Sequence, residues 1–347
     1  MIYCIQVTLN SWQCLFLTFG SIFENNEKAF QFCQTRNLIP SNDRKDCVDC
    51  GTEGKVSVCK YSRNENFPYE LRCSACRKST SIVKDTWFSN SKLLIKQSLG
   101  LVYCWLLGLT LEVASDEIDV NIKTALDYYN FCREVCYVIT TQSSTPIGGP
   151  GHEVEIDESH ICTRKYNRGR LLHNETQHIW VFGGIDRETK NCFITRVKKR
   201  DRQTLVNIIK KFILPGTKII TDGWKAYNKL EEGGYIHECV NHSVEFVNSE
   251  DRSVHTQNVE RLWKSLKQTM KKEGRPTERD QMYIFQFIYT HQQKAAGIDT
   301  PRKMFDAFLT DISKVYPGYG RIPLAPVNFC GLNEVDIFDD DEDQDTE

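Results

Sequence analysis

Three acidic residues are placed where their side chains could act together on a phosphodiester bond. Asp157 lies in a stretch that alternates apolar and polar residues, Asp222 ends a second apolar stretch, and Glu260 opens a segment with helical periodicity. Carboxylates that converge from separate elements can hold two divalent cations about 3.5–4 Å apart, and Mg²⁺ or Mn²⁺ suits such oxygen ligands. Each acid alone also fits an ordinary strand, turn or helix surface, so only the set indicates a metal-dependent site.

The segments around these acids predict a mixed α/β domain. Apolar or alternating runs predict strands, and apolar spacings of three and four predict helices. The expected strands are 153–161, 178–186, 192–197, 217–222 and a short 244–247, and the expected helices are 205–212, 256–270 and 277–296. Acids on the first strand, the fourth strand and a later helix are the ribonuclease H-like arrangement, in which those two strands are neighbours. We therefore expect Asp157 and Asp222 to meet.

The predicted helix that carries Glu260 also carries bases. Lys264 and Lys267 follow Glu260 at intervals of four and three residues, which places them along one side of a helix. Bases beside a metal site could contact DNA phosphates, whereas a solvated helix face needs no partner. At the start of this helix, His255 could orient a ligand or a water, and Asn258 could be an alternative third ligand or a helix cap.

Two further basic runs follow predicted strands. The first contains Arg164, Lys165, Arg168 and Arg170 without an acid, and the second occupies 198–202. Both have the composition of soluble loops. Beside a metal site, we expect them to contact the DNA backbone rather than the bases.

Four cysteines ahead of this domain have the spacing of a structural metal site. Cys47 and Cys50 form one CxxC pair, and Cys73 and Cys76 form a second pair after 22 intervening residues, which a hairpin at 56–72 can absorb. Four thiolates close a tetrahedron around one Zn²⁺ and leave no open position for catalysis. The alternatives are unrelated thiols or a redox pair. Most of the other cysteines, out of 15 in all, are scattered singly, as expected for free thiols in a reducing compartment.

Between the cysteines and the acids, the pattern predicts three helices at 92–108, 111–118 and 122–138, with a turn at 119–121. A short helix, a turn and a longer helix resemble a helix-turn-helix, which would place Lys123 against DNA, although simple three-helix packing gives the same pattern. The chain then divides into 1–43 (extension and short helix), 44–90 (zinc ribbon), 91–139 (helix-turn-helix-like segment), 140–152 (linker), 153–298 (catalytic domain) and 299–347 (C-terminal extension with an acidic tail).

The formal net charge of −2 hides an uneven distribution. Residues 336–347 contain eight acids and no base, so the rest of the chain carries +6 and permits an anionic partner. The longest near-continuous apolar run, 99–109, falls well short of the about 20 residues that a membrane span needs. The N-terminus has no basic region ahead of its apolar stretch, so we expect an intracellular protein that is not secreted and has no membrane partner.

As a set, the motifs resemble those of Merlin-type DDE transposases, which are similar to the ISXO-like insertion-sequence transposases of bacteria. The resemblance covers about residues 20–298. It rests on VEIDES (154–159), KYNRGR (165–170), WVFGGIDRETKNCF (180–193), IITDGWKAY (219–227) and HTQNVERLWKSLK (255–267), and on RKSTSIVKDTWFSNSKL (77–93) and KTALDYYNFCREV (123–135) before them.

The resemblance implies a ribonuclease H-like catalytic domain and cut-and-paste DNA transposition. It maps the triad onto Asp157, Asp222 and Glu260 and a following basic position onto Lys267. The expected partners are terminal inverted repeats and target DNA, handled by a homodimer or larger assembly, in the nucleus of a eukaryote or the cytoplasm and nucleoid of a bacterium. The alternatives are a domesticated DNA-binding protein without catalysis and a ribonuclease H-like DNA nuclease.

Overall fold

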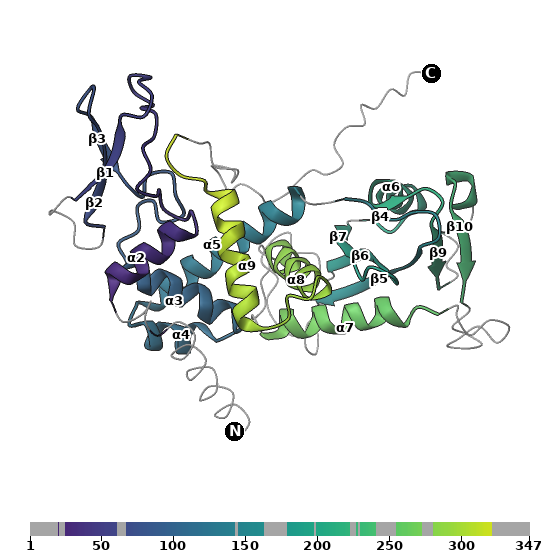
Figure 1. Cartoon of the computed structure of the whole chain (residues 1–347). Helices are drawn as coiled ribbons and strands as arrows, with labels where there is room; N and C mark the ends of the chain where they lie inside the picture. Colours follow the sequence, from purple (N-terminus) through teal and green to yellow (C-terminus); the bar gives the residue numbers. More distant parts are fainter. Residues whose placement is uncertain are drawn as a thin grey trace, which may run out of the picture.

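The computed structural model describes residues 20, 25–60, 67–142, 145–162, 179–197, 199–222, 227, 230–240, 255–272 and 280–320. In this part of the chain, a small three-stranded sheet lies at one end, a group of helices lies in the middle, and a larger mixed sheet lies at the other end (Figure 1). None of the described helices is both long and apolar enough to cross a bilayer.

The small sheet joins the cysteine segment to the helices. Strands β1 (Val56–Lys60), β2 (Tyr69–Cys73) and β3 (Ser79–Ser81) form an antiparallel meander, in agreement with the expected hairpin. Helix α2 (Asn26–Thr35) begins at Asn25, whose side chain accepts a hydrogen bond from the Lys28 amide, and Phe30 of this helix stacks on Tyr69 of β2. The 1–43 region therefore contributes to the core through α2.

Three helices follow with nearly the expected bounds: α3 (Ile95–Leu106), α4 (Leu111–Ile118) and α5 (Ile122–Gln142). The turn between α4 and α5 ends at Asn121, whose side chain accepts a hydrogen bond from the Lys123 amide at 2.9 Å and so caps α5. Helix α5 continues past residue 139 to Gln142, and the hydroxyls of Thr140 and Thr141 donate to carbonyls one turn earlier within the helix. The first residues of the expected linker are thus helical.

The described remainder of the expected linker, residues 145–152, contains a short strand that pairs outside the larger sheet. Strand β4 (Ile147–Gly148) pairs in parallel with β8 (Ile213–Leu214), and the Gly149 amide donates to the Thr217 hydroxyl at 2.8 Å. Gly148 has a φ of +84°, and a Cβ at this position would lie 2.4 Å from that hydroxyl oxygen. Glycine is therefore required for this close approach.

Helix α9 (Pro301–Val315), in the C-terminal region, packs in the hydrophobic core that also contains α2, α3 and α5. Its buried residues, among them Phe305 and Phe308, share a hydrophobic cluster with α2, α3 and α5. Phe308 contacts both Trp105 and Tyr289 through its ring. The 299–347 region, described from the sequence as an extension, thus supplies a core helix.

The larger sheet has five strands in the order β10-β9-β5-β6-β7. The strands are β5 (Glu153–Cys162), β6 (Ile179–Asp186), β7 (Cys192–Val197), β9 (Lys218–Thr221) and β10 (Ile236–Cys239). β5, β6 and β7 are antiparallel neighbours, whereas β9 and β10 add in parallel. The expected mixed α/β fold is confirmed, as is the contact between the first and fourth strands. The expected strand at 244–247 lies outside the described residues.

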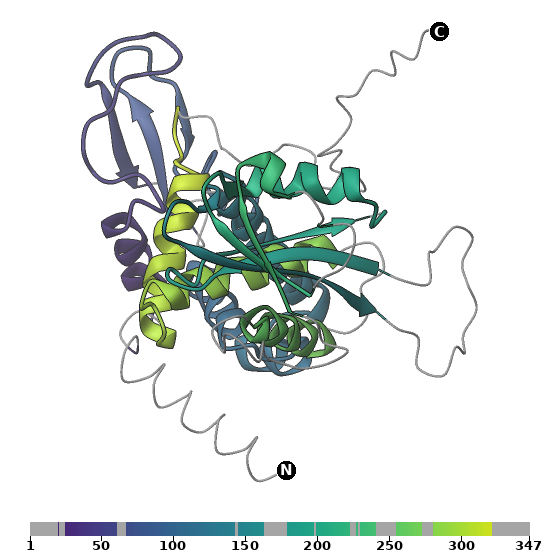
Figure 2. The ribbon, with the colours of Figure 1, turned by 90° about the vertical axis from the view of Figure 1, so that its right-hand side faces the viewer.

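Helices cover both faces of this sheet (Figure 2). Helix α6 (Arg202–Phe212) packs on the face that contains Val154 and Ile156 of β5. Helices α7 (Gln257–Lys272) and α8 (Asp280–Ala295) pack on the opposite face, against β6 and β7. A short 3₁₀ turn, η3 (Leu230–Gly233), precedes β10. Because side chains alternate along a strand, Glu155 and Asp157 of β5 face the α7 side.

Candidate active site and metal centre

Asp157 and Asp222 lie level with each other on neighbouring parallel strands. Glu153 pairs with Lys218 and Glu155 with Ile220, so the same register brings Asp157 opposite Asp222, which directly follows β9. Partners in a parallel register point to the same face. The strand pairing therefore brings the two acids together at the end of β9, although they are 65 positions apart in the sequence.

The carboxylate of Asp157 is largely buried beneath α7. The indole Nε1 of Trp263 donates a hydrogen bond to its Oδ2 at 3.0 Å. Burial, together with the negative charges of Glu158 and Asp222, raises the pKa of Asp157 to about 7, and the bond from Trp263 opposes this rise. A largely buried carboxylate close to other acids attracts a cation strongly. Carboxylates with a raised pKa are frequent at functional sites.

Gly183 makes room for the indole. It stands opposite Asp157 in the β5–β6 register. A Cβ at Gly183 would lie 2.5 Å from the Phe193 carbonyl oxygen and 2.9 Å from the Trp263 ring. Only glycine leaves space here for the tryptophan to lie on the sheet and reach Asp157.

The first turn of α7 is fixed to β5 two residues before Asp157. Glu155 accepts hydrogen bonds from the backbone amides of Asn258 and Val259 and from the Asn258 side chain. Asn258, the second residue of α7, therefore anchors the helix to β5, and Glu155 rather than Asn258 accepts from the first amides of the helix. His255, just before α7, contacts Arg187 through Nδ1 and through its carbonyl.

Glu260 lies in the first turn of α7 with an exposed side chain, and it precedes Trp263 by about one helical turn. Lys264 is exposed and Lys267 is half-buried on the same helix. Among the described residues, one group of three or more possible metal ligands has all its ligand atoms within 4.8 Å of one another, and it consists of four cysteines. The three acids thus lie on adjoining elements without converging on one point, and like charges repel at such a site unless a cation lies between them.

Glu158 and Tyr227 belong to this region and were not singled out from the sequence. The Tyr227 hydroxyl donates to the Glu158 carboxylate. Burial raises the pKa of Glu158, and Asp222 adds to the effect. The available signal was the tyrosine five residues after Asp222, within the IITDGWKAY motif.

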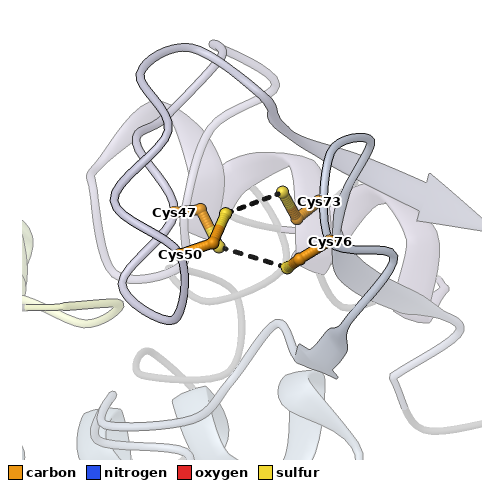
Figure 3. A group of neighbouring side chains, drawn as sticks. All are labelled: Cys47, Cys50, Cys73 and Cys76. Carbon is orange, nitrogen blue, oxygen red and sulfur yellow. Dashed lines mark hydrogen bonds between the residues drawn. The ribbon is translucent and has the colours of Figure 1, made fainter.

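The four predicted zinc ligands converge. The Sγ atoms of Cys47, Cys50, Cys73 and Cys76 all lie within 4.8 Å of one another (Figure 3). Two of the separations are 3.7 Å (Cys47 to Cys76) and 3.9 Å (Cys50 to Cys73). A tetrahedral zinc site with Zn–S bonds of about 2.3 Å has S···S edges of about 3.8 Å. The residues therefore fit a structural Zn²⁺, whereas Cys59 lies outside the cluster on β1.

Within this cluster, the thiolate form of Cys50 is favoured. The hydroxyl of Thr52 lies 3.2 Å from the Cys50 sulfur, and hydrogen bonds from Thr52 lower the pKa of Cys50 to about 6. Zinc binds thiolates rather than thiols.

The structure describes only some of the expected DNA-contacting residues. Arg164, Lys165, Arg168 and Arg170 lie outside the described residues. Lys123 is exposed in the first turn of α5, and Asp119 and Asp127 lie nearby in the sequence. Acids beside Lys123 weaken its attraction for phosphates.

Comparison with known proteins supports one family. Residues 148–289 match the ISXO2-like transposase domain. No curated protein matches the chain. Among solved structures, the integrase catalytic core domain of HTLV-2, in complex with magnesium, is 14% identical with a TM-score of 0.27, over 41% of this chain and 84% of that chain. The simian T-cell lymphotropic virus intasome, in complex with PP2A regulatory subunit B56 gamma, is 13% identical with a TM-score of 0.27, over 54% of this chain and 66% of that chain.

Proposed function

We propose, from the match of residues 148–289 to the ISXO2-like transposase domain, that the protein is a metal-dependent DNA transposase. The observation that carries the proposal is the strand register, which brings Asp157 of β5 opposite Asp222, the residue that follows β9. The strand order, three antiparallel strands followed by two parallel ones, supports a ribonuclease H-like catalytic domain.

Asp157, Asp222 and Glu260 are the proposed ligands of two Mg²⁺ or Mn²⁺ ions. When bound, such ions lower the pKa of an attacking hydroxyl and stabilise the leaving oxygen. Asp157 and Asp222 provide anionic oxygens from fixed strands, and Trp263 keeps Oδ2 of Asp157 in one orientation. Glu260 would complete the site from α7. The proposed reaction is cleavage at terminal inverted repeats, followed by attack of the freed 3′-hydroxyl on target DNA.

The remaining parts of the chain suit DNA recognition. A zinc ribbon around Cys47, Cys50, Cys73 and Cys76 and the α4–α5 pair are proposed to recognise the terminal repeats. Lys264 and Lys267, on the helix of Glu260, and the bases at 164–170 are proposed to contact phosphates. Joining two DNA ends requires at least two active sites, so we propose a dimer or larger assembly that acts in the nucleus of a eukaryotic host or the nucleoid of a bacterium.

A domesticated DNA-binding protein without catalysis is the second candidate. The exposed position of Glu260, apart from the two aspartates, favours it. In that case the four-cysteine segment and the helices would bind DNA, and the acids would be remnants.

The test uses DNA that carries the flanking ends of the gene. The purified protein is incubated with this DNA and Mg²⁺ or Mn²⁺, beside Asp222→Asn and the exposed-acid control Glu188→Gln. We expect metal-dependent cleavage at the ends and joining to a target plasmid, lost in Asp222→Asn and retained in Glu188→Gln. Binding without cleavage by all three proteins would favour the domesticated candidate, and cleavage of branched DNA without joining would favour a nuclease.

A further inference from the structure

A single buried carboxylate joins the strand of Asp157 to the helix of Glu260. Glu155 is fully buried. It accepts hydrogen bonds from the Asn258 amide at 2.7 Å, the Val259 amide at 3.0 Å and the Asn258 side chain at 2.6 Å. The first amides of a helix have no partner within the helix, and the helix dipole favours a negative charge there. Glu155 therefore caps α7 from outside the helix.

Arg187 neutralises this carboxylate and extends the contact. It directly follows β6, and its Nε donates to Glu155 at 2.6 Å. Its other nitrogens donate to Glu153 at 2.6 Å and to the His255 carbonyl at 2.7 Å. A buried carboxylate without such a partner would be strongly destabilising. The guanidinium thus connects β5, the end of β6 and the residues that lead into α7.

The two contacts between β5 and α7 have matching spacing. Glu155 contacts Asn258, and Asp157 contacts Trp263. The two residues from Glu155 to Asp157 span about 6.7 Å along the strand, and the five residues from Asn258 to Trp263 span about 7.5 Å along the helix. These lengths are similar, so both contacts can form when the strand and the helix lie side by side. Together the contacts fix the offset and the rotation of α7 relative to β5. Glu260 lies between these two contact points along α7.

We propose that Glu155 and Arg187 are positioning residues, which hold the first turn of α7 against β5 so that Glu260 keeps a fixed place relative to Asp157; this role rests on the proposed function. With Asn258, they form what we call the α7 anchor. Neither Glu155 nor Arg187 is proposed to touch DNA or metal. A misplacement of about 1 Å at a reacting centre can cost about 100-fold in rate, which is enough for such a role to be measurable.

The test compares the two carboxylates that share Arg187. Glu155→Asp keeps the charge beside Arg187 but is one methylene too short to reach α7. Glu155→Gln keeps the length and removes the charge. Glu153→Gln is the matched control, because Glu153 also bonds Arg187 but has no hydrogen bond to α7 in the described structure. Asn258→Ala, which removes one bond from a partly exposed side chain, is the milder variant in case the buried changes unfold the protein.

Three properties are measured on the full-length protein: kcat for cleavage of the end DNA, affinity for that DNA, and hydrogen exchange of the backbone amides of α7. We expect Glu155→Asp and Glu155→Gln to lower kcat about 10- to 100-fold, and Asn258→Ala about 3- to 10-fold, with affinity for DNA retained. Amides at 258–260 should exchange faster, whereas the later amides of α7 keep their protection. Glu153→Gln should lose less rate and leave the first turn protected.

Unchanged exchange at 258–260 in Glu155→Asp, or an equal loss of kcat in Glu153→Gln, would overturn the proposal. The exchange measurement does not depend on catalysis. If the wild-type protein does not cut DNA, the proposed function fails with it, and faster exchange confined to the first turn of α7 would still show that Glu155 anchors this helix.

Discussion

The indole of Trp263 donates a hydrogen bond from Nε1 to Oδ2 of Asp157, at 3.0 Å, across the interface between α7 and β5. Trp263 is itself buried, and Gly183 provides the space in which its ring lies. An indole N–H donates and never accepts, so it stabilises the ionised carboxylate.

Trp263→Phe should therefore weaken metal binding. The phenyl ring keeps most of the packing but leaves a buried carboxylate oxygen without its donor, at a cost of about 1–3 kcal/mol. We expect the Mg²⁺ concentration for half-maximal cleavage to rise about 3- to 10-fold and Mn²⁺ binding in calorimetry to weaken in parallel. Trp180→Phe, at an indole that stacks under Arg200, is the control. Equal metal dependence of Trp263→Phe and the wild type would contradict this role.

The raised pKa of Asp157 predicts how stability depends on pH in metal-free protein. Its pKa lies near 7 in the folded state against an ordinary 3.8, so the folded state binds the proton more tightly than the unfolded state. The resulting stabilisation is present below about pH 4 and is lost as the pH rises through about 7. An asparagine side chain cannot ionise, so Asp157→Asn does not lose stability as the pH rises. The variant should therefore be more stable than the wild type at pH 8, by about 2 kcal/mol.

Urea denaturation at pH 5 and pH 8, with a chelator of Mg²⁺ present that spares zinc, measures this difference. Adding Mg²⁺ at pH 8 should stabilise the wild type and not Asp157→Asn. A difference in unfolding free energy that is the same at both pH values would show that Asp157 has an ordinary pKa.

The four-cysteine cluster should contain one zinc ion per chain. Cys73→Ser removes one of four thiolates and should lower the bound zinc, measured by elemental analysis, and also lower the melting temperature. Stability should fall because Cys47 and Cys73 lie in the same hydrophobic cluster as α2 and α3. Cys59→Ser is the matched control, since Cys59 lies on β1 outside the cluster. Equal zinc content in Cys73→Ser and Cys59→Ser would rule out the site.

Helix α9 should be required for the stability of the core that it forms with α2, α3 and α5. Phe308 is fully buried against Trp105 and Tyr289, and Phe308→Ala should cost about 3–5 kcal/mol in unfolding free energy. Arg302→Ala, at an exposed position of the same helix, should change it little. Similar chemical denaturation curves for the two variants would mean that α9 detaches from this core in solution.

Much of the local structure could be predicted from the sequence. Helix α4 and strand β7 have the predicted bounds, because their apolar periodicity ends at clear turn signals. The cysteine cluster was predictable because the spacing within each CxxC pair already brings two thiols close enough to bind the same metal ion. The adjacency of β5 and β9 followed from the order of elements around Asp157 and Asp222.

The sequence could not predict contacts between distant elements. Glu155 reads as one more polar residue in an alternating strand, yet it is buried because Arg187 and the amides of α7 satisfy it, at separations of 32 and 103 positions. Helix α9 follows the catalytic region in the sequence but packs with the first helices, and no local pattern specifies which core an amphipathic helix joins. The exposed position of Glu260 likewise depends on which face of α7 packs on the sheet.

We expect Asp157 and Asp222 to bind the catalytic metal between β5 and β9. Iron-mediated backbone cleavage tests it directly: Fe²⁺ replaces Mg²⁺, ascorbate and peroxide generate hydroxyl radicals at the ion, and mass spectrometry locates the cuts. We predict cuts next to Asp157 and Asp222, suppressed by excess Mg²⁺ and absent in Asp157→Asn, with a cut near Glu260 if α7 completes the site. Cuts that map elsewhere, or that persist unchanged in Asp157→Asn, would contradict the claim.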